Sequence, residues 1–162
     1  MELDQKVAEV TIDPRTKEMI NIDVHRSSLK FKCQRCAVFC CKLGPPPLLP
    51  GDTERFKQAG VDTGRFFNSE LTSLRTTKEG FCSLMSVNIR EGTCKCSIYD
   101  LRPALCRLYP FRFEKSGPHS YALKFIPCCN GLNRDDGESV DGRFFAQHLR
   151  MILDEMIKSN VV

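Results

Sequence analysis

The stretch KCQRCAVFCC, residues 32–41, constrains this chain more than any other, because it places four cysteines within nine positions. The whole chain carries ten cysteines among 162 residues. Thiols at this density serve as disulfides, as metal or iron–sulfur ligands, or as catalytic groups. These alternatives need different surroundings, so the rest of the sequence can be used to choose between them.

The first residues, MELDQKVAEV, show neither the basic n-region nor the apolar h-region of a signal peptide. We therefore expect a cytoplasmic protein. Every apolar run is broken within a few residues by charge, Gly or Pro, so we expect no direct membrane insertion. In a reducing cytosol, dense cysteine indicates metal binding or redox chemistry rather than structural disulfides.

The net charge of +4 is modest, and the basic residues are scattered. Arg102, Arg107 and Arg112 form the only noticeable basic cluster. A nucleic-acid-binding surface requires a basic stripe with interleaved aromatic residues, which this sequence lacks. We therefore expect no nucleic-acid partner.

Hydrophobic alternation predicts three β-hairpins. The first joins AEVTI and INIDV across DPRTK, the second has its turn at REGT, and the third at SGPH. Short helices are predicted after an N-cap at Asp52 or Thr53 and after one at Asp62. A further short helix should begin near Pro103 and run through Cys106.

The C-terminal stretch, residues 140–160, is predicted to be a helix capped by Asp141. Its apolar residues recur at helical spacing, which is typical of a helix packed on a core: Phe145, Leu149, Ile152 and Met156. The fold class expected is α+β, a small single domain (1–162) of short β-hairpins and a C-terminal helix around a cysteine-ligated metal or Fe–S site. Within it we expect an N-terminal hairpin arm (1–32) and a cysteine-rich core (33–130).

Cys33-x-x-Cys36 has the spacing at which two thiolates turn onto one metal centre. Thiolates are soft ligands that favour zinc, iron–sulfur or Cu(I). In an extended segment the adjacent Cys40 and Cys41 would point to opposite faces, so at most one should join Cys33 and Cys36. The pair Cys128–Cys129 repeats this arrangement, and two such pairs suit two neighbouring sites. The candidate ligands are Cys33, Cys36, Cys40, Cys41, Cys82, Cys96, Cys106, Cys128 and Cys129, with Cys94 as an additional candidate.

CQRCAVFCC, then Cys82, then CSIYDLRPALCRLYPF resembles the CxxCxxCC (YkgJ-like) cysteine-cluster family, described as zinc- or iron-chelating. The resemblance spans roughly residues 31–130. It implies metal or Fe–S binding by Cys33, Cys36, Cys41, Cys82, Cys96 and Cys106. The chain departs from the family pattern by having three residues, 37–39, before the vicinal pair where two are usual.

The second motif also suggests residues that surround the ligands. Arg102 and Arg107 would offset the negative charge of a four-thiolate centre. Tyr109, with Phe111 and Phe113, would form an apolar wall that limits access of solvent and oxygen.

We find no GxGxxG motif, no P-loop and no His–Cys–Asp constellation, so a non-enzymatic protein is expected. Because cysteines are nearly the only candidate ligands, we favour one [4Fe–4S] cluster, with a second cluster or Zn²⁺ as alternatives. The expected function is a redox- or oxygen-responsive accessory protein that binds a larger protein or enzyme complex. The alternatives are a zinc-stabilised interaction module and a small electron-transfer protein.

Overall fold

The computed structural model describes residues 6–25, 28–37, 40–42, 44–68, 70 and 72–162. It contains both helices and antiparallel sheets and is of the expected α+β class. The chain divides into two compact units, one of residues 1–34 with 108–162 and one of residues 35–107. The single-domain organisation stays a prediction. Within the described part of the chain, no helix has the length and apolar character needed to cross a membrane.

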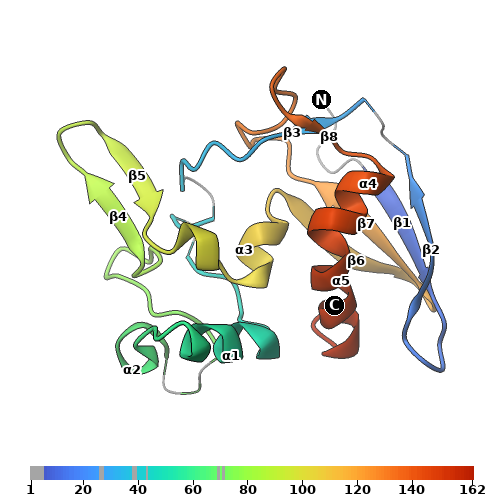
Figure 1. Cartoon of the computed structure of the whole chain (residues 1–162), viewed down its shortest axis with the longest axis horizontal. Coiled ribbons are helices and arrows are strands. Elements are labelled where there is room, and N and C mark those ends of the chain that lie inside the picture. Colours follow the sequence, from blue (N-terminus) through green and yellow to red (C-terminus); the bar gives the residue numbers. More distant parts are fainter. Residues whose placement is uncertain (1–5, 26–27, 38–39, 43, 69, 71) are drawn as a thin grey trace. The chain divides into compact units, whose positions relative to one another are not determined.

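The first unit is built on a four-stranded antiparallel sheet in the order β2-β1-β7-β6 (Figure 1). Strands β1 (Lys6–Ile12) and β2 (Met19–Val24) form the first predicted hairpin. Strands β6 (Phe111–Gly117) and β7 (Ser120–Phe125) form the third. The two hairpins join because β1 pairs with β7, with Val10 opposite Tyr121. This pairing between distant segments joins the β1 edge of one hairpin to the β7 edge of the other, so neither of these edges is left unpaired.

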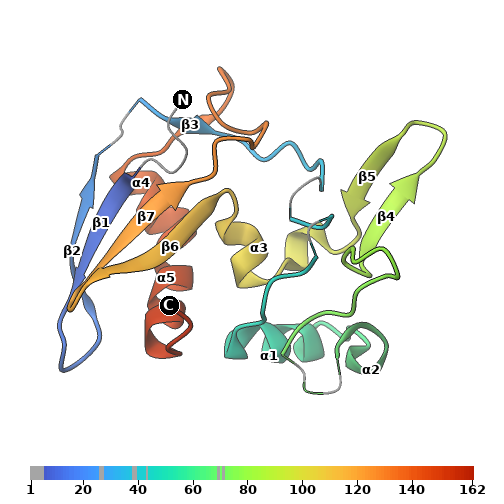
Figure 2. The same cartoon turned by 180° about the vertical axis from the view of Figure 1, so that it is seen from behind.

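The predicted C-terminal helix is present and interrupted by one wider turn. It comprises α4 (Gly142–Phe144), the π-helical turn η2 (Phe145–Leu149) and α5 (Arg150–Lys158). Asp141 caps it by accepting hydrogen bonds from the backbone N–H groups of Arg143 and Phe144 at 3.0 and 3.1 Å. The helix lies across one face of the sheet (Figures 1 and 2). The predicted apolar stripe is buried there: Phe145, Leu149, Ile152 and Met156.

A second, short sheet of the first unit pairs β3 (Lys30–Phe31) with β8 (Glu138–Ser139). Its Phe31 ring meets Phe111 at 5.8 Å and Phe144 at 6.3 Å, both edge to face. This aromatic cluster places β3 against the core of the sheet.

The second unit contains α1 (Pro50–Gln58), α2 (Thr63–Phe66), the hairpin of β4 (Met85–Asn88) and β5 (Thr93–Cys96), and the 3₁₀ turn η1 (Tyr99–Leu101). Helix α3 (Ala104–Leu108) follows at its end. The Phe56 and Phe67 rings pack edge to face at 5.4 Å in its core. Cys41 and Cys82 belong to the same buried apolar cluster. The unit therefore has thiols inside its core.

The start of α1 differs from the prediction. The helix begins at Pro50 with Leu49 as N-cap, so the expected caps Asp52 and Thr53 lie inside it. Proline suits the first helical turn, because its missing N–H would have no partner there. Gly60, in the left-handed region at φ +75°, follows the helix end.

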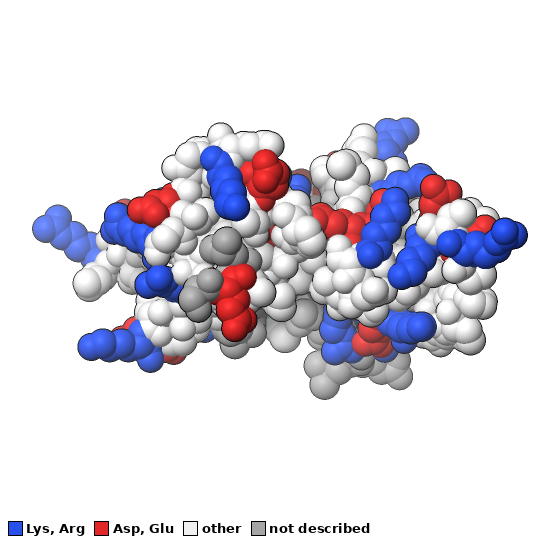
Figure 3. All heavy atoms as spheres, turned by 90° about the horizontal axis from the view of Figure 1, so that it is seen from below, with Lys and Arg blue, Asp and Glu red and all other residues white. Residues whose placement is uncertain are grey.

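The exposed charges agree with the modest net charge. Lys and Arg side chains lie interspersed with Asp and Glu on the face drawn in Figure 3. The absence of a nucleic-acid partner stays a prediction.

Candidate metal centre

Five cysteines converge on one pocket in the unit of residues 35–107. The pocket has a volume of about 10 Å³, room for a single ion or water-sized body. Its remaining walls are apolar, apart from Arg102. The lining residues are Cys40, Cys41, Cys82, Cys96 and Cys106, with Leu74, Leu84, Ile98, Arg102 and Pro103.

The five thiols reach the pocket from four local structures. Cys40 and Cys41 lie in a turn, and the Cys41 carbonyl accepts hydrogen bonds from the N–H groups of Cys82 at 2.9 Å and of Gly44 at 3.2 Å. Cys96 ends β5 opposite Met85. Cys106 is carried by α3. The backbone hydrogen bond between Cys41 and Cys82 thus holds together two cysteines that are 41 positions apart in the sequence.

Cys40 and Cys41 were expected to point to opposite faces, yet both line this pocket. That at most one of them joins Cys33 and Cys36 on one centre stays a prediction. The expectation of opposite faces assumed an extended segment, in which neighbouring side chains alternate. Cys40–Lys42 form a turn instead, and a turn can direct successive side chains to one side. Two of the three residues before the pair, 38–39, lie outside the described residues.

The Cys41 thiol is the hub of the pocket. Its single S–H proton has Cys40, Cys82 and Cys96 as possible acceptors, and this hydrogen bonding, with burial, raises its pKa. Hydrogen bonding to Cys41 lowers the pKa of Cys40 to about 7 and that of Cys96 to about 6, and Arg102 lowers both further. The pKa of Cys82 is lowered by the Cys41 bond and by the N–H of Leu84. Cys40, Cys82 and Cys96 therefore favour the thiolate form beside the protonated Cys41.

Cys106 differs from the other four. Burial raises the pKa of its thiol, and the neighbouring charges of Cys40, Cys82 and Cys96 raise it further. The interactions that link Cys106 to these three thiols are electrostatic. The Cys106 thiol therefore keeps its proton, as the Cys41 thiol does.

Arg102 is held in place beside the thiols. Its guanidinium lies 3.8 Å from the centre of the Tyr99 ring, and its Nε donates to the Tyr99 carbonyl at 2.9 Å. The Arg35 guanidinium stands over the same ring at 4.0 Å. Cation–π contacts of this kind restrain both arginines. The predicted role of Arg102 in offsetting thiolate charge is consistent with this position.

Asp52 is a structural residue that the sequence alone did not single out for this role. Its carboxylate is buried and accepts from the N–H groups of Leu49 and Ala104, both at 2.9 Å, and from Arg55 at 2.6 Å. Arg55 also donates to the Arg102 carbonyl at 3.2 Å. The sequence signal was only that of an aspartate near a helix start. Asp52 braces the 102–104 segment that borders the pocket.

The other predicted residues do not line this pocket. Cys33 and Cys36 are half-buried, and Cys94 packs against the apolar cluster of the second unit. Arg107 is not among the lining residues, and Tyr109, Phe111 and Phe113 belong to the first unit. The apolar wall consists of Leu74, Leu84, Ile98 and Pro103 instead.

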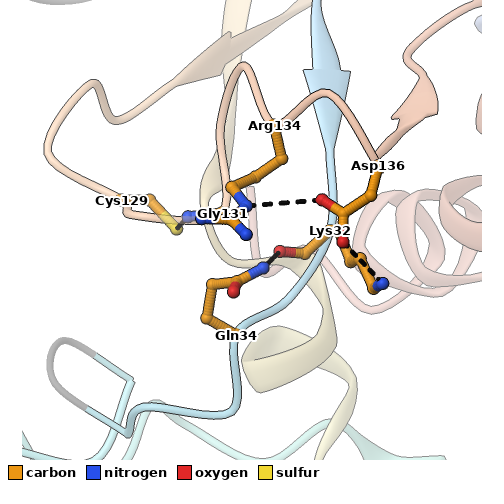
Figure 4. Close-up of polar contacts among 6 residues, drawn as sticks. All are labelled: Lys32, Gln34, Cys129, Gly131, Arg134 and Asp136. Carbon is orange, nitrogen blue, oxygen red and sulfur yellow. Dashed lines mark hydrogen bonds and ion pairs between the residues drawn. The ribbon is translucent and has the colours of Figure 1, made fainter.

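Cys128 and Cys129 lie in the first unit, where Cys128 is exposed. Cys129 Sγ accepts a hydrogen bond from the Gly131 N–H at 3.4 Å. Figure 4 shows this pair beside Lys32 and Gln34. The Lys32 N–H donates to the Gly131 carbonyl at 2.9 Å, so the two segments run in contact. A side chain at position 131 would meet the Lys32 carbonyl at 2.6 Å, which explains the glycine.

The donor set of the pocket suits a soft metal ion, because it offers five thiols and no carboxylate or imidazole among its lining residues. Within the described ranges, no group of three or more Cys, His, Asp or Glu side chains is already arranged as a metal site. The pocket thus gathers suitable ligands without presenting a finished coordination geometry.

Known proteins provide an independent comparison. The family model CxxCxxCC, described as "Putative zinc- or iron-chelating domain", matches residues 32–130, a stretch that contains all ten cysteines. The chain is also similar to an uncharacterized protein, MJ0661, of Methanocaldococcus jannaschii. The two are 29% identical over 136 residues, which is 77% of this chain and 70% of that protein. No solved structure matches the chain.

Proposed function

The chain belongs to the CxxCxxCC family, and we propose that its five-thiol pocket binds one thiophilic metal ion, with zinc as the first candidate. We also propose that the protein has no catalytic role. The observation that carries this proposal is the convergence of five cysteines from four separate segments on one pocket. The role of the ion is to hold those segments together, because a bound ion stabilises the folded state that presents its ligands.

The size of the pocket supports a single ion. In a tetrahedral zinc site, with Zn–S bonds of about 2.3 Å, neighbouring sulphurs lie about 3.8 Å apart. Cys41 is already within hydrogen-bonding reach of Cys40, Cys82 and Cys96. Small side-chain rotations would therefore suffice to place four sulphurs around an ion. A cluster of four irons and four sulfides would need these thiols to spread further.

A second candidate is a [4Fe–4S] cluster in a redox- or oxygen-responsive accessory protein. It is favoured by the all-sulphur donor set and by the apolar wall of Leu74, Leu84 and Ile98, which would limit access of water and oxygen. Loss of the cluster would release the Cys40–Lys42 turn and so alter a surface that binds a larger protein complex.

Purification in air and under nitrogen, followed by metal analysis, tests the proposal. We expect about one zinc per chain and colourless protein from both preparations. Protein free of metal in both would contradict the proposal. Brown anaerobic protein that absorbs near about 400 nm and contains iron and sulfide would replace it with the second candidate.

Zinc affinity is expected to decrease as the pH is lowered, and the decrease should be steeper below about pH 7. Cys40 and Cys96, with pKa values of about 7 and about 6, are thiolates at higher pH. At lower pH the ion must displace a proton from each, so the slope of log Kd against pH should steepen by up to about two. Competition titrations with a chromophoric chelator across this interval measure the slope. A slope that stays constant across both pKa values would contradict the prediction. The Cys94→Ser variant is the control and should show the same slope as wild type.

A further inference from the structure

The hairpin of β4 and β5 is a two-stranded sheet that extends away from α1 and α2 of its unit (Figures 1 and 2). Among the residues that the structure describes, no third strand pairs with it. A two-stranded hairpin is only marginally stable in water, and its edges expose backbone N–H and C=O groups that can pair with another chain. Each edge of this hairpin therefore needs either protection or a partner.

The outer edge of β4 lacks the charged side chains with which proteins protect such edges. The strand, Met85–Asn88, contains no Lys, Arg, Asp, Glu or Pro. The other edge strands of the described residues each carry at least one charged side chain. These are Asp23 on β2, Lys30 on β3, Lys95 on β5, Arg112, Glu114 and Lys115 on β6, and Glu138 on β8. Charge discourages pairing with a second chain, so β4 is the edge most open to it.

The backbone of β4 directs hydrogen-bonding groups toward this edge. The Leu84 C=O accepts the Ser97 N–H at 2.9 Å, in the same register as the pairs between β4 and β5. The backbone groups of successive residues in an antiparallel strand point alternately to one side and to the other. Since those of Leu84 point toward the opposite strand, the N–H and C=O of Val87, three residues later, point away from β5.

The side chains along this edge form an apolar row that the unit covers only at its inner end. Met85 and Val87 lie on one face of the strand, because side chains two positions apart point the same way. Met85 packs against the apolar cluster of the second unit, whereas Val87 is 55% exposed. Ile89, which directly follows β4, is 91% exposed. An uncharged edge with exposed apolar side chains is typical of a strand that pairs with another chain.

We propose that two copies of this chain pair through the outer edges of β4, antiparallel and about a twofold axis at Val87, and so form one four-stranded sheet in the order β5-β4-β4-β5. In this register Val87 lies opposite itself, and Met85 lies opposite Ile89 of the second copy. Ser86 lies opposite Asn88. Apolar side chains therefore meet apolar ones, polar side chains meet polar ones, and no like charges are opposed.

The pattern of the strand favours a second copy as the occupant. A twofold axis pairs both unprotected edges at once, and twofold dimers are the commonest homo-oligomers. Moving the axis to Asn88 would place Ser86 opposite Arg90 and Met85 opposite Glu91, which would set an apolar side chain against a charge. The register centred on Val87 avoids this mismatch. The pairing goes beyond the proposed metal binding and makes no use of the thiols of the pocket.

Sedimentation velocity of the full chain, as purified, tests the proposal. A reducing agent is included because Cys128 is exposed and could link chains covalently. The paired segment is far smaller than the roughly 1,600 Å² that specific, stable interfaces bury, so the dimer should depend on concentration. We expect mostly monomer at about 1 µM and mostly dimer at about 300 µM.

Two lysine variants locate the contact. Val87→Lys places two like charges opposite each other at the twofold axis and should raise the Kd of the dimer by about tenfold or more. Thr93→Lys is the matched control, because Thr93 is exposed on β5 and pairs with Asn88 on the inner side of the hairpin. It should leave the Kd unchanged. Circular dichroism should show that both variants keep the secondary structure of the wild type.

Amide hydrogen exchange distinguishes strand pairing from contact through another surface. The Val87 N–H should exchange several-fold more slowly in a concentrated sample than in a dilute one. The N–H of Cys94, on the outer edge of β5, should exchange at the same rate in both. A chain that stays monomeric at about 300 µM would overturn the inference and leave this edge to a strand of another protein. A dimer that survives Val87→Lys, or one that does not slow exchange at Val87, would overturn it as well.

Discussion

Replacement of Cys41 by serine is expected to weaken zinc binding by about 100-fold or more. Cys41 is the buried hub that meets the thiols of Cys40, Cys82 and Cys96. The hydroxyl of serine is a harder and less acidic donor, so it would not replace the thiolate at a soft ion. Competition titration against a chelator of known affinity measures the change.

Cys94→Ser is the control for this experiment, because Cys94 is half-buried on β5 and does not line the pocket. Circular dichroism of the metal-free variants should show that both keep their secondary structure. If Cys41→Ser bound zinc with wild-type affinity, Cys41 would not be a ligand, and the assignment of the centre to this pocket would fail.

Replacement of Asp52 by alanine is expected to lower the free energy of unfolding of the metal-free protein by about 3 kcal/mol. The carboxylate is only 1% exposed and accepts hydrogen bonds from Leu49, Ala104 and Arg55. Its removal would leave two buried N–H groups without an acceptor and would part α1 from the start of α3. Urea denaturation followed by circular dichroism measures the loss.

A second aspartate supplies the matched control. Asp62 caps α2 by accepting the Arg65 N–H at 3.1 Å, but its side chain is exposed. Asp62→Ala should therefore cost about 1 kcal/mol or less. Asp52→Asn keeps one acceptor oxygen and should fall between the two. An Asp52→Ala variant within about 0.5 kcal/mol of wild type would show that the carboxylate does not brace this unit.

The local elements of the fold were largely predictable from the sequence. Alternation of apolar residues predicted the hairpins β1–β2, β4–β5 and β6–β7, since a hairpin depends on neighbouring residues and its turn. The joining of β1 to β7 was not predictable in this way, because it pairs residues more than 100 positions apart. Such pairing depends on which apolar faces are left to be buried after the hairpins have formed.

The role of Asp52 shows the same limit. An aspartate at the start of a helix is typical of an N-cap, and the sequence predicted that role. In the structure it lies one turn inside α1 and accepts the N–H of Ala104, 52 positions further on. A carboxylate in the first turn is compatible with a solvated cap or a buried brace, and only the packing of α3 against α1 decides between them.

By itself, the sequence indicated the chemistry of this protein: its ten thiols, in a pattern that the model of a zinc- or iron-chelating family matches, favour metal binding. Only the tertiary structure decided that Cys40, Cys41, Cys82, Cys96 and Cys106 share one pocket and that the other five cysteines lie outside it. The vicinal pair illustrates the reason. Side-chain direction follows backbone dihedral angles, and the turn at Cys40–Lys42 brings together two thiols that an extended chain would separate.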